Sequence, residues 1–264
     1  MATKKNTVAG MLARIPARRL YEVMLWASTS GLGMNNYEMD INGETRFARD
    51  WFSKNQNRRL TVFDLGGHEG WFSTIAANHP NRDLHVFEPH PASRARIQQL
   101  RLEGIHIWPF AVGAEPGNAT LWDHDPAGSS DASLFREAVT HVGMETVGFP
   151  VEVVTLDDFC TKQGIQKIDY LKVDVEGSER AVFKGGQRMI QNGIDIIHFE
   201  VNGKALLDGF SVDKAADLLR GYRLYRILPN RLMPLNKWAP STEVFRYQNI
   251  IATQEGEKSN GSAS

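Results

Sequence analysis

The chain has 264 residues, of which 42% are apolar and 23% charged, and 30 Lys and Arg stand against 31 Asp and Glu. This length and composition predict one globular domain with a sizeable core. The balanced charge gives no general basic field for a nucleic acid, so a small-molecule partner is expected. A single cysteine, Cys160, excludes an intrachain disulfide framework and a zinc site built on paired thiolates, and it favours a reducing, cytoplasmic location.

The N-terminal region is basic, with Lys4, Lys5, Arg14, Arg18 and Arg19. The apolar stretch at residues 21–27 is too short to span a membrane and includes Glu22. Residues 9–27 could form a basic amphipathic helix on a membrane surface, but a helix that packs on its own domain is more common, and we expect that arrangement. The following loop, residues 34–37, could be a lid over a ligand or a plain connection.

From residue 60 onward, short apolar runs alternate with helical patterns, which predicts repeated βαβ units and a mostly parallel sheet. The expected strands are residues 60–65, 84–87, 105–112, 119–122, 151–154, 168–173, 194–201, 222–228 and 243–252. The first expected helix has an apolar face formed by Trp71, Phe72, Ile75 and Ala76. The second follows Pro91, and Ile97, Leu100 and Leu102 form its apolar face. Two more helices are expected at residues 156–162 and 178–191. Residues 113–150 interrupt this rhythm with turn clusters and are expected to be an insertion beside the site.

A glycine-rich loop follows the first expected strand, with the sequence Leu65-Gly-Gly-His-Glu-Gly70. Glycines at the end of a parallel strand let backbone N–H groups and a helix N-terminus approach a ligand closely. The dinucleotide fingerprint G-x-G-x-x-G needs a glycine where Leu65 stands, so the loop suits S-adenosylmethionine better than NAD. The structural alternative is a simple turn.

Carboxylates stand at the ends of the expected strands. Glu88 follows the second strand at the position from which an acidic residue accepts the hydroxyls of a ribose. Asp174 and Glu176 follow the strand at residues 168–173 and would reach the edge where open α/β sheets bind ligands. The structural alternatives are a solvated strand end for Glu88 and a helix-entry turn at residues 174–179.

Three segments of the chain resemble the FkbM-type S-adenosylmethionine-dependent methyltransferases. The loop at residues 62–70 is similar to the family's V-x-D-V-G-A-N-x-G, with Gly67 and His68 in place of the Ala and Asn, and residues 86–91 resemble its F-E-P strand end. The most specific similarity is Thr155-Leu-Asp-Asp158 followed by residues 168–179, which resemble T-L-D-D and D-x-L-K-I-D-V-E-G-x-E. Weaker similarities include Gly43-Glu44 and Phe199-Glu200.

The resemblance implies the α/β fold of the class I methyltransferases, a Rossmann-like, doubly wound, mostly parallel sheet of seven strands with an antiparallel last strand. We expect an N-terminal helical extension with a candidate lid at residues 1–55 and a methyltransferase domain at 56–253. The polar composition of residues 254–264 predicts a disordered tail. The resemblance implies methyl transfer from S-adenosylmethionine to an acceptor, usually a hydroxyl oxygen of a small molecule or glycan. The implied cofactor-binding residues are Asp64, Gly66, Gly67, His68, Gly70, Glu88, Pro89, Ala111, Val112 and Asp174.

Methyl transfer to an alcohol also needs a group that accepts the hydroxyl proton. The candidate catalytic residues are Asp174, Glu176, Glu200 and His198. His198 and Glu200 lie two apart on a strand and therefore share a face, and the structural alternative for His198 is a buried histidine paired with a carboxylate. No metal site is expected, because the three carboxylates lack convincing further ligands.

Two other functions remain open at this stage. A nicotinamide-dependent oxidoreductase is disfavoured by Leu65 and by the absence of a Tyr-x-x-x-Lys pair at Tyr170. The second alternative function is that of a catalytically inactive nucleoside-binding module with the same fold, because a fold by itself does not determine activity.

Overall fold

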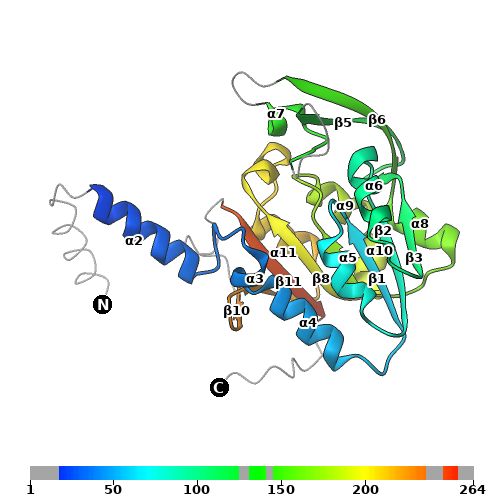
Figure 1. Cartoon of the computed structure of the whole chain (residues 1–264), viewed down its shortest axis with the longest axis horizontal. Coiled ribbons are helices and arrows are strands. Elements are labelled where there is room, and N and C mark those ends of the chain that lie inside the picture. Colours follow the sequence, from blue (N-terminus) through cyan, green and yellow to red (C-terminus); the bar gives the residue numbers. More distant parts are fainter. Residues whose placement is uncertain (1–17, 125–130, 141–144, 236–245, 255–264) are drawn as a thin grey trace.

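The computed structural model describes residues 18–124, 131–140, 145–235 and 246–254. They form an α/β fold around an eight-stranded sheet with the strand order β10-β9-β11-β8-β7-β1-β2-β3 (Figure 1). The strands are β1 (Leu60–Leu65), β2 (Arg82–Phe87), β3 (Ile105–Trp108), β7 (Ile168–Val173), β8 (Ile194–Val201), β9 (Tyr222–Ile227), β10 (Leu232–Pro234) and β11 (Gln248–Gln254).

The sheet is mostly parallel, as predicted. β3, β2, β1, β7 and β8 pair in parallel, whereas β11 is antiparallel to both of its neighbours, β8 and β9. The predicted number of seven strands is one too low, because β10 pairs with β9 and adds a short eighth strand at the edge. The predicted start of the last strand, residues 243–245, lies outside the described residues.

A second sheet contains three strands in the order β4-β6-β5, namely β4 (Phe110–Val112), β6 (Thr146–Val154) and β5 (Gly117–His124). The predicted single strand at residues 105–112 is therefore wrong. Pro109 separates β3 in the large sheet from β4 in the small one, because proline has no N–H to donate to a strand ladder. The expected strands at 119–122 and 151–154 are parts of the longer β5 and β6, so the stretch expected to be an insertion is largely ordered around this sheet.

The helices are α2 (Arg18–Gly31), α3 (Met39–Asn42), α4 (Glu44–Lys54), α5 (Trp71–Ala77), α6 (Pro91–Gln99), α7 (Arg136–Val139), α8 (Leu156–Gln163), α9 (Glu179–Gly185), α10 (Gln187–Asn192), the 3₁₀ helix η1 (Gly203–Asp208) and α11 (Val212–Leu218). The helix predicted at residues 178–191 is in fact two helices. They separate at Gly185 and Gly186, where a Cβ on Gly185 would meet the carbonyl of Gly113. Leu100, predicted to be buried, is exposed because α6 ends before it.

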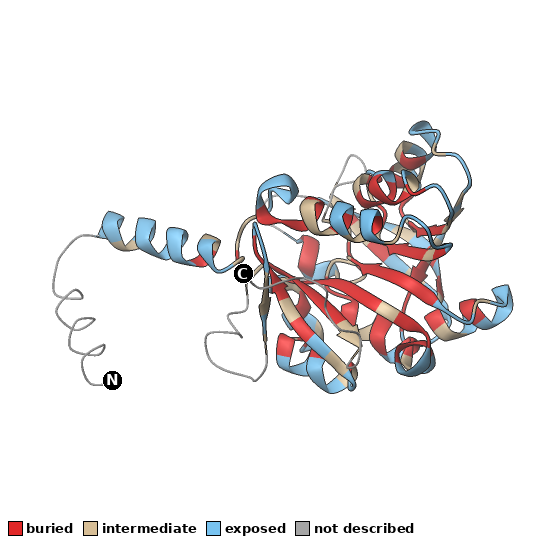
Figure 2. Cartoon of the chain, turned by 90° about the horizontal axis from the view of Figure 1, so that it is seen from below, coloured by how far each residue is buried: buried red, intermediate tan, exposed pale blue. Residues whose placement is uncertain are grey.

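The apolar core lies on both faces of the large sheet (Figure 2). Along β1, Val62 packs on one face with residues of α4, α5 and α6, and the next residue, Phe63, packs on the other face with residues of α8. A parallel strand that is buried on both faces consists almost entirely of apolar residues. This explains why the boundaries of β1 and β7 could be predicted from the sequence. Truncation of such a buried phenylalanine to alanine typically costs about 3–5 kcal/mol.

The helix α2 projects away from this body (Figures 1 and 2). Thr29 is its one buried residue, and Leu20, Val23, Leu25 and Trp26 are exposed. The expectation that the helix at residues 9–27 packs on its own domain is wrong for residues 18–27, whereas residues 9–17 lie outside the described residues. In the part of the chain that the structure describes, no helix combines the length and the apolar character needed to cross a membrane.

Candidate active site

A cavity of about 710 Å³ lies at the carboxyl ends of β1, β2, β7 and β8. Its volume falls within the range of sites that hold small molecules. Tyr37 and Met39 before α4, the small sheet at Ala111 and Leu121, and Lys204 of η1 also contribute to its wall. The cavity therefore lies where open α/β sheets bind their ligands.

The glycine loop forms one wall of the cavity, and its shape depends on Gly66. Gly66 has φ +86°, and a Cβ there would lie 1.8 Å from the carbonyl oxygen of Asp174. Its N–H donates to the carbonyl of Phe87 at 2.9 Å. The ends of β1, β2 and β7 approach one another so closely at this point that only glycine fits.

Gly67 and His68, which stand where the FkbM-type loop has alanine and asparagine, each have a structural reason. A Cβ on Gly67 would lie 2.5 Å from Cγ1 of Val86 and 2.9 Å from Cδ1 of Ile97, so the neighbouring side chains occupy the space of an alanine methyl group. His68 has φ +43°, in the left-handed region where Asn, Asp and His are enriched among non-glycine residues. Histidine therefore replaces asparagine at a position that requires this conformation.

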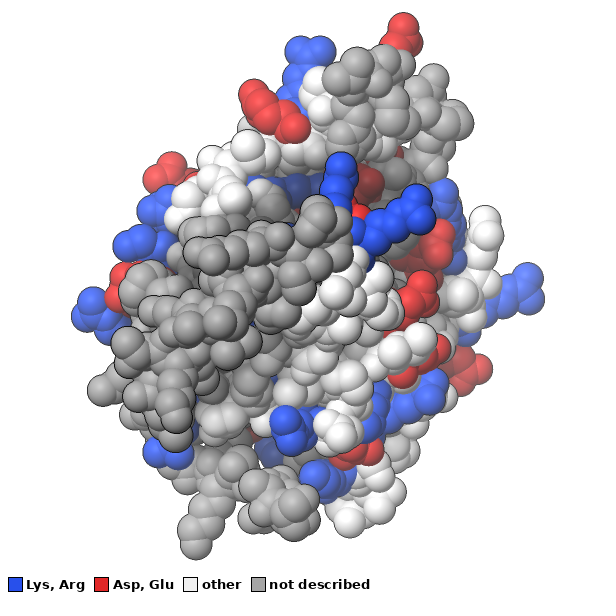
Figure 3. Space-filling view, turned by 90° about the vertical axis from the view of Figure 1, so that its left-hand side faces the viewer, with Lys and Arg blue, Asp and Glu red and all other residues white. Residues whose placement is uncertain are grey.

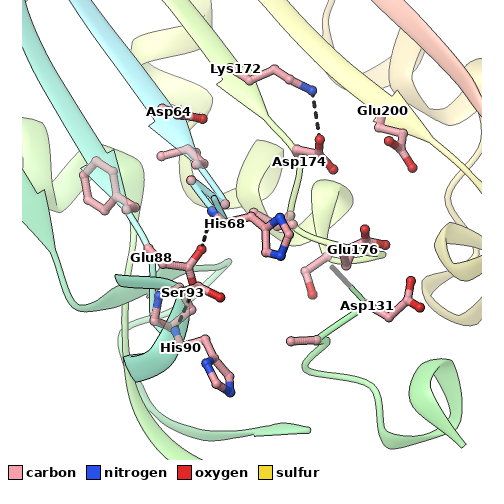
Figure 4. Close-up of a pocket in the computed structure, with 18 of the residues that line it drawn as sticks. Asp64, His68, Glu88, His90, Ser93, Asp131, Lys172, Asp174, Glu176 and Glu200 are labelled. Carbon is pink, nitrogen blue, oxygen red and sulfur yellow. Dashed lines mark hydrogen bonds and ion pairs between the residues drawn. The ribbon is translucent and has the colours of Figure 1, made fainter. Parts of the chain in front are cut away.

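Glu88 is buried in the cavity wall with its carboxylate beside the glycine loop (Figure 4). One oxygen accepts from the backbone N–H of His68 at 2.7 Å and the other from that of His90 at 2.8 Å. Burial nevertheless dominates and raises the pKa of Glu88 to about 7. The alternative of a solvated strand end is not what the structure shows, and Pro89 also lines the cavity.

Asp64, at the end of β1, faces the start of α5. It accepts from the hydroxyl of Ser73 at 2.5 Å, and burial raises its pKa to about 6. Gly70 has φ +79° and precedes the first residue of α5, so the loop passes directly into that helix. These contacts fix the loop to α5 at the wall of the cavity.

Lys172 and four acidic residues, Glu44, Asp174, Glu176 and Glu200, occupy the opposite side of the cavity (Figure 4). Lys172 Nζ lies 3.0 Å from Asp174 Oδ2 and 3.9 Å from Glu44 Oε2. Glu200 lies nearby on β8, where burial, followed by the charges of Asp174 and Glu176, raises its pKa well above the usual range. A carboxyl group in such surroundings keeps its proton to a higher pH than usual, and in that form it can donate a hydrogen bond.

Glu176 is held between β7 and η1. Its Oε2 accepts from Lys204 at 2.8 Å and from the side-chain amide of Asn202 at 3.3 Å. Its pKa is raised to about 7, first by burial and then by Asp174. Its backbone has φ +53°, and a non-glycine residue in this conformation stores strain of the kind that recurs at functional sites.

The turn that carries Glu176 is stabilised by Glu179. One oxygen of Glu179 accepts from the N–H groups of Val175 and Gly177, each at 3.2 Å, and burial raises the pKa of this carboxyl to about 8. Ser133 donates to the carbonyl of Glu176 at 2.7 Å from the small-sheet side. The segment is thus a helix-entry turn, as in the structural alternative, and it also presents Asp174 and Glu176 to the cavity.

His198 does not reach the cavity. Its ring lies 2.9 Å from the hydroxyl of Tyr170 and 3.1 Å from the amide oxygen of Asn249, and it is fully buried. Burial lowers its pKa well below the usual value, so the ring is neutral. Among the four catalytic candidates, the structure brings Asp174, Glu176 and Glu200 together and places His198 in a structural hydrogen-bond network that also adjoins Glu44 at 3.6 Å.

The remaining predicted residues all border the cavity except Gly70. Ala111 and Val112 do so from β4 of the small sheet rather than from the third strand of the large one. Sequence reasoning did not propose Lys172, Asn202, Lys204, Asp131 or Tyr247, which also line the cavity. A signal existed for Lys172, because a lysine inside an otherwise apolar buried strand needs charged partners.

The described residues contain one group of side chains close enough to share a metal ion, Asp83, His85 and His106, and it lies away from the cavity. The indole N–H of Trp108 donates to Nδ1 of His85 at 3.2 Å, so the neutral ring carries its proton on Nε2. That nitrogen faces Asp83 Oδ1 at 3.2 Å, and a metal ion would need its lone pair. Asp83 Oδ1 also lies 3.3 Å from Nε2 of His106, and we interpret the three residues as a polar cluster at the edge of the sheet.

Comparisons with known proteins give a consistent result. The model of the methyltransferase FkbM domain matches residues 64–224. The 2-O-methyltransferase NoeI of Sinorhizobium fredii is 28% identical over 181 residues, which are 64% of this chain and 74% of that protein. The 31-O-demethyl-FK506 methyltransferase FkbM of Streptomyces tacrolimicus is 30% identical over 189 residues, or 61% and 71% of the two chains.

Among solved structures, a methyltransferase FkbM from Methylobacillus flagellatus aligns with a TM-score of 0.45 and 11% identity. The alignment covers 85% of this chain and 57% of that one.

Proposed function

Because the chain belongs to the FkbM methyltransferase family, we propose that it transfers a methyl group from S-adenosylmethionine to a hydroxyl oxygen of a small molecule or glycan. One observation carries this proposal. The cavity unites the glycine loop, Glu88 and the turn from Asp174 to Glu176, which lie far apart in the sequence. Two of the relatives are O-methyltransferases by name, and a nicotinamide-dependent reaction has no such support.

The cavity has features that fit S-adenosylmethionine. Among the described lining residues, two lysines face eight acidic residues, Glu44, Asp64, Glu69, Glu88, Asp131, Asp174, Glu176 and Glu200. Burial raises the pKa of five of these groups, Glu44, Asp64, Glu88, Glu176 and Glu200, so part of the negative charge is neutralised, and the ionised remainder favours a cationic sulfonium ligand. Nε2 of His68 is buried beside the loop without a hydrogen-bond partner, so a polar ligand group could satisfy it. Glu88 would accept the ribose hydroxyls and the loop would hold the methionine end.

When bound, S-adenosylmethionine supplies an electrophilic methyl group on sulfur. The protein then has two tasks, to orient the acceptor hydroxyl and to accept its proton. Glu176 is our candidate for the proton acceptor, since a pKa of about 7 lets the carboxylate take up a proton near neutral pH and release it again. Lys204, which donates to Glu176, would stabilise the ionised form between turnovers.

Asp174 and Glu200 would position the acceptor. The ion pair with Lys172 holds the Asp174 carboxylate at the strand end, where it could accept a hydrogen bond from a substrate hydroxyl. Glu200, whose raised pKa favours the protonated form and whose other oxygen accepts from Asn202 at 2.6 Å, could donate one. The two groups offer opposite hydrogen-bonding character within one site, which is suited to a hydroxylated ligand.

The acceptor is best described as neutral and hydroxylated. The acidic lining would repel a carboxylate or phosphate group. The rings of Tyr37 and Tyr247, with centroids 4.3 Å apart, supply an aromatic surface at the wall near Met39. Aromatic faces combined with carboxylates are suited to contact the apolar face and the hydroxyl groups of a sugar or a polyol.

Titration calorimetry of the purified chain tests the cofactor assignment. S-adenosylmethionine and S-adenosylhomocysteine are expected to bind and NAD to show no heat of binding. A preference for NAD would contradict the proposal. Transfer of a labelled methyl group to neutral polyhydroxylated compounds, compared with their carboxylated or phosphorylated analogues, then tests the acceptor class, and a preference for the anionic analogues would refute it.

A further inference from the structure

The helix α2 presents an apolar face that has no partner among the described residues. Its large apolar side chains are between 44% and 66% exposed, namely Leu20, Val23, Met24, Leu25 and Trp26. On a helical projection, Val23, Ala27, Leu20, Met24, Tyr21 and Leu25 lie on one side, interspersed with Gly31 and Ser28, whereas Arg18, Arg19 and Glu22 lie on the other side together with Trp26. An exposed apolar patch of this kind marks an interaction surface.

The segment that follows the C-terminal end of α2 is attached to the large sheet. Met34 is buried and forms a β-bridge with Gln248 of β11, and Arg226 of β9 donates to the carbonyl of Leu32 at 3.3 Å. A Cβ on Gly33 would lie 2.4 Å from the carbonyl oxygen of Ile227, so the chain passes directly against β9. The helix therefore leaves the sheet from an anchored position, with its apolar face directed away from the core.

The charge of the N-terminal sequence is opposite to that of the remainder. Residues 1–31 contain Lys4, Lys5, Arg14, Arg18 and Arg19 with Glu22 as the one acidic residue, a net charge of +4. Since the whole chain has a net charge of −1, residues 32–264 carry −5. In the visible part of the face from which α2 projects, basic and acidic side chains of the body are interspersed (Figure 3).

From these observations we propose that α2 docks the enzyme onto an anionic lipid surface. The apolar side would enter the boundary between headgroups and acyl chains, and Arg18 and Arg19 would contact anionic headgroups. The helix would lie in the plane of the interface rather than cross the bilayer, in agreement with the 14 residues of its described part. This docking is independent of which acceptor the cavity binds.

Charge favours a lipid surface over a second copy of the chain. A symmetric dimer formed by two α2 helices would bring two segments of +4 together, which is repulsive, whereas an anionic bilayer attracts the same charge. The exposed apolar residues also continue after the helix to Leu32, Tyr37 and Met39, of which the last two line the cavity. Docking would therefore hold this wall of the cavity close to the membrane.

Co-sedimentation of the full chain with vesicles tests the proposal. Binding to vesicles of phosphatidylglycerol and phosphatidylcholine is expected to exceed binding to phosphatidylcholine alone by at least about tenfold, and to weaken as the salt concentration rises. The double variant Leu20→Ser, Met24→Ser should lose most of the binding to the anionic vesicles. Arg18→Gln, Arg19→Gln should retain weaker binding with a smaller dependence on salt.

The matched control is Leu206→Ser, Leu207→Ser, which removes two similarly exposed leucines from η1 and should bind as the unchanged chain does. Melting temperatures of all variants verify that the body is folded. Equal binding to both kinds of vesicle, no binding to either, or full binding by the Leu20, Met24 variant would overturn the proposal. A dimer in sedimentation velocity that this variant converts to a monomer would assign the face to a second copy instead.

Discussion

Lys172 Nζ lies 3.0 Å from Asp174 Oδ2 at the end of β7, and the same nitrogen lies 3.9 Å from Glu44 Oε2 at the start of α4. Both Lys172 and Glu44 are almost completely buried. The carboxylates outweigh the effect of burial on the lysine and raise its pKa, while burial raises that of Glu44. One buried cation therefore connects the helix before the first strand to the strand end that carries the candidate catalytic turn.

Replacement of Lys172 by methionine should destabilise the protein by about 3–5 kcal/mol, because it leaves buried carboxylate charge without its partner. Urea denaturation measures the loss. Lys214→Met is the control, since its contact with Asp217 at 3.8 Å is exposed and should contribute no more than about 1 kcal/mol. Equal stability of the two variants would show that Lys172 does not compensate these charges.

Glu88→Ala should weaken the binding of S-adenosylhomocysteine at least about tenfold, because a charged hydrogen-bonding group is removed from the proposed ribose site. Calorimetry gives the dissociation constant. Glu103→Ala, an exposed residue between α6 and β3, should bind normally. Glu88 also holds two backbone N–H groups, so Glu88→Gln and the melting temperature separate loss of a contact from loss of the loop. An unchanged constant in both variants would refute the ribose assignment.

Asp174→Asn should reduce turnover more than cofactor affinity. The amide keeps the size of the side chain but removes the negative charge that we assign to orientation of the acceptor. Comparison of kcat with the dissociation constant of S-adenosylhomocysteine tests this assignment. If turnover is retained, or if both quantities fall by the same factor, Asp174 does not act on the acceptor.

Glu176→Gln should lower kcat/KM by about 10²–10⁴, the usual contribution of a general base. The carboxylate must be ionised to accept a proton, so kcat/KM of the unchanged enzyme should fall as the pH decreases through about 7. The residual activity of the variant should lack this decrease. An acidic limb that persists in Glu176→Gln would assign the titration to another group.

The protein without ligand should become less stable as the pH rises from 6.5 to 8.5. Burial raises the pKa of Glu88 and Glu176 to about 7 and that of Glu179 to about 8, whereas these groups are ionised in the unfolded chain throughout this range. The folded state thus binds more protons, so the free energy of unfolding falls as the pH rises through the folded pKa values.

Histidines with lowered pKa values, such as His198, are neutral in the folded state and mostly neutral in the unfolded state over this range, so they contribute little there. Thermal melts at several pH values measure the trend. A melting temperature that stays constant or increases between pH 6.5 and 8.5 would show that these carboxyl groups are not buried in their protonated form.

The glycine loop and the strand at residues 168–173 predict the family and the fold class from the sequence. Local chemistry suffices for this, because strands buried on both faces are continuously apolar and the turn at Gly66 accepts only glycine. Pro109 was also visible in the sequence. That β3 and β4 belong to different sheets was not, since an apolar run does not specify which strands will pair with it.

Sequence by itself determined the βαβ order, the loop and the chemical types of the cavity residues, all of which depend on neighbours along the chain. Only the tertiary structure decided which carboxylates meet. His198 and Glu200 are two residues apart on β8, yet Tyr170 and Asn249 enclose the histidine while the glutamate lines the cavity. Packing from distant segments makes that distinction. The apolar side of α2, which was expected to pack on its own domain, has no partner among the described residues.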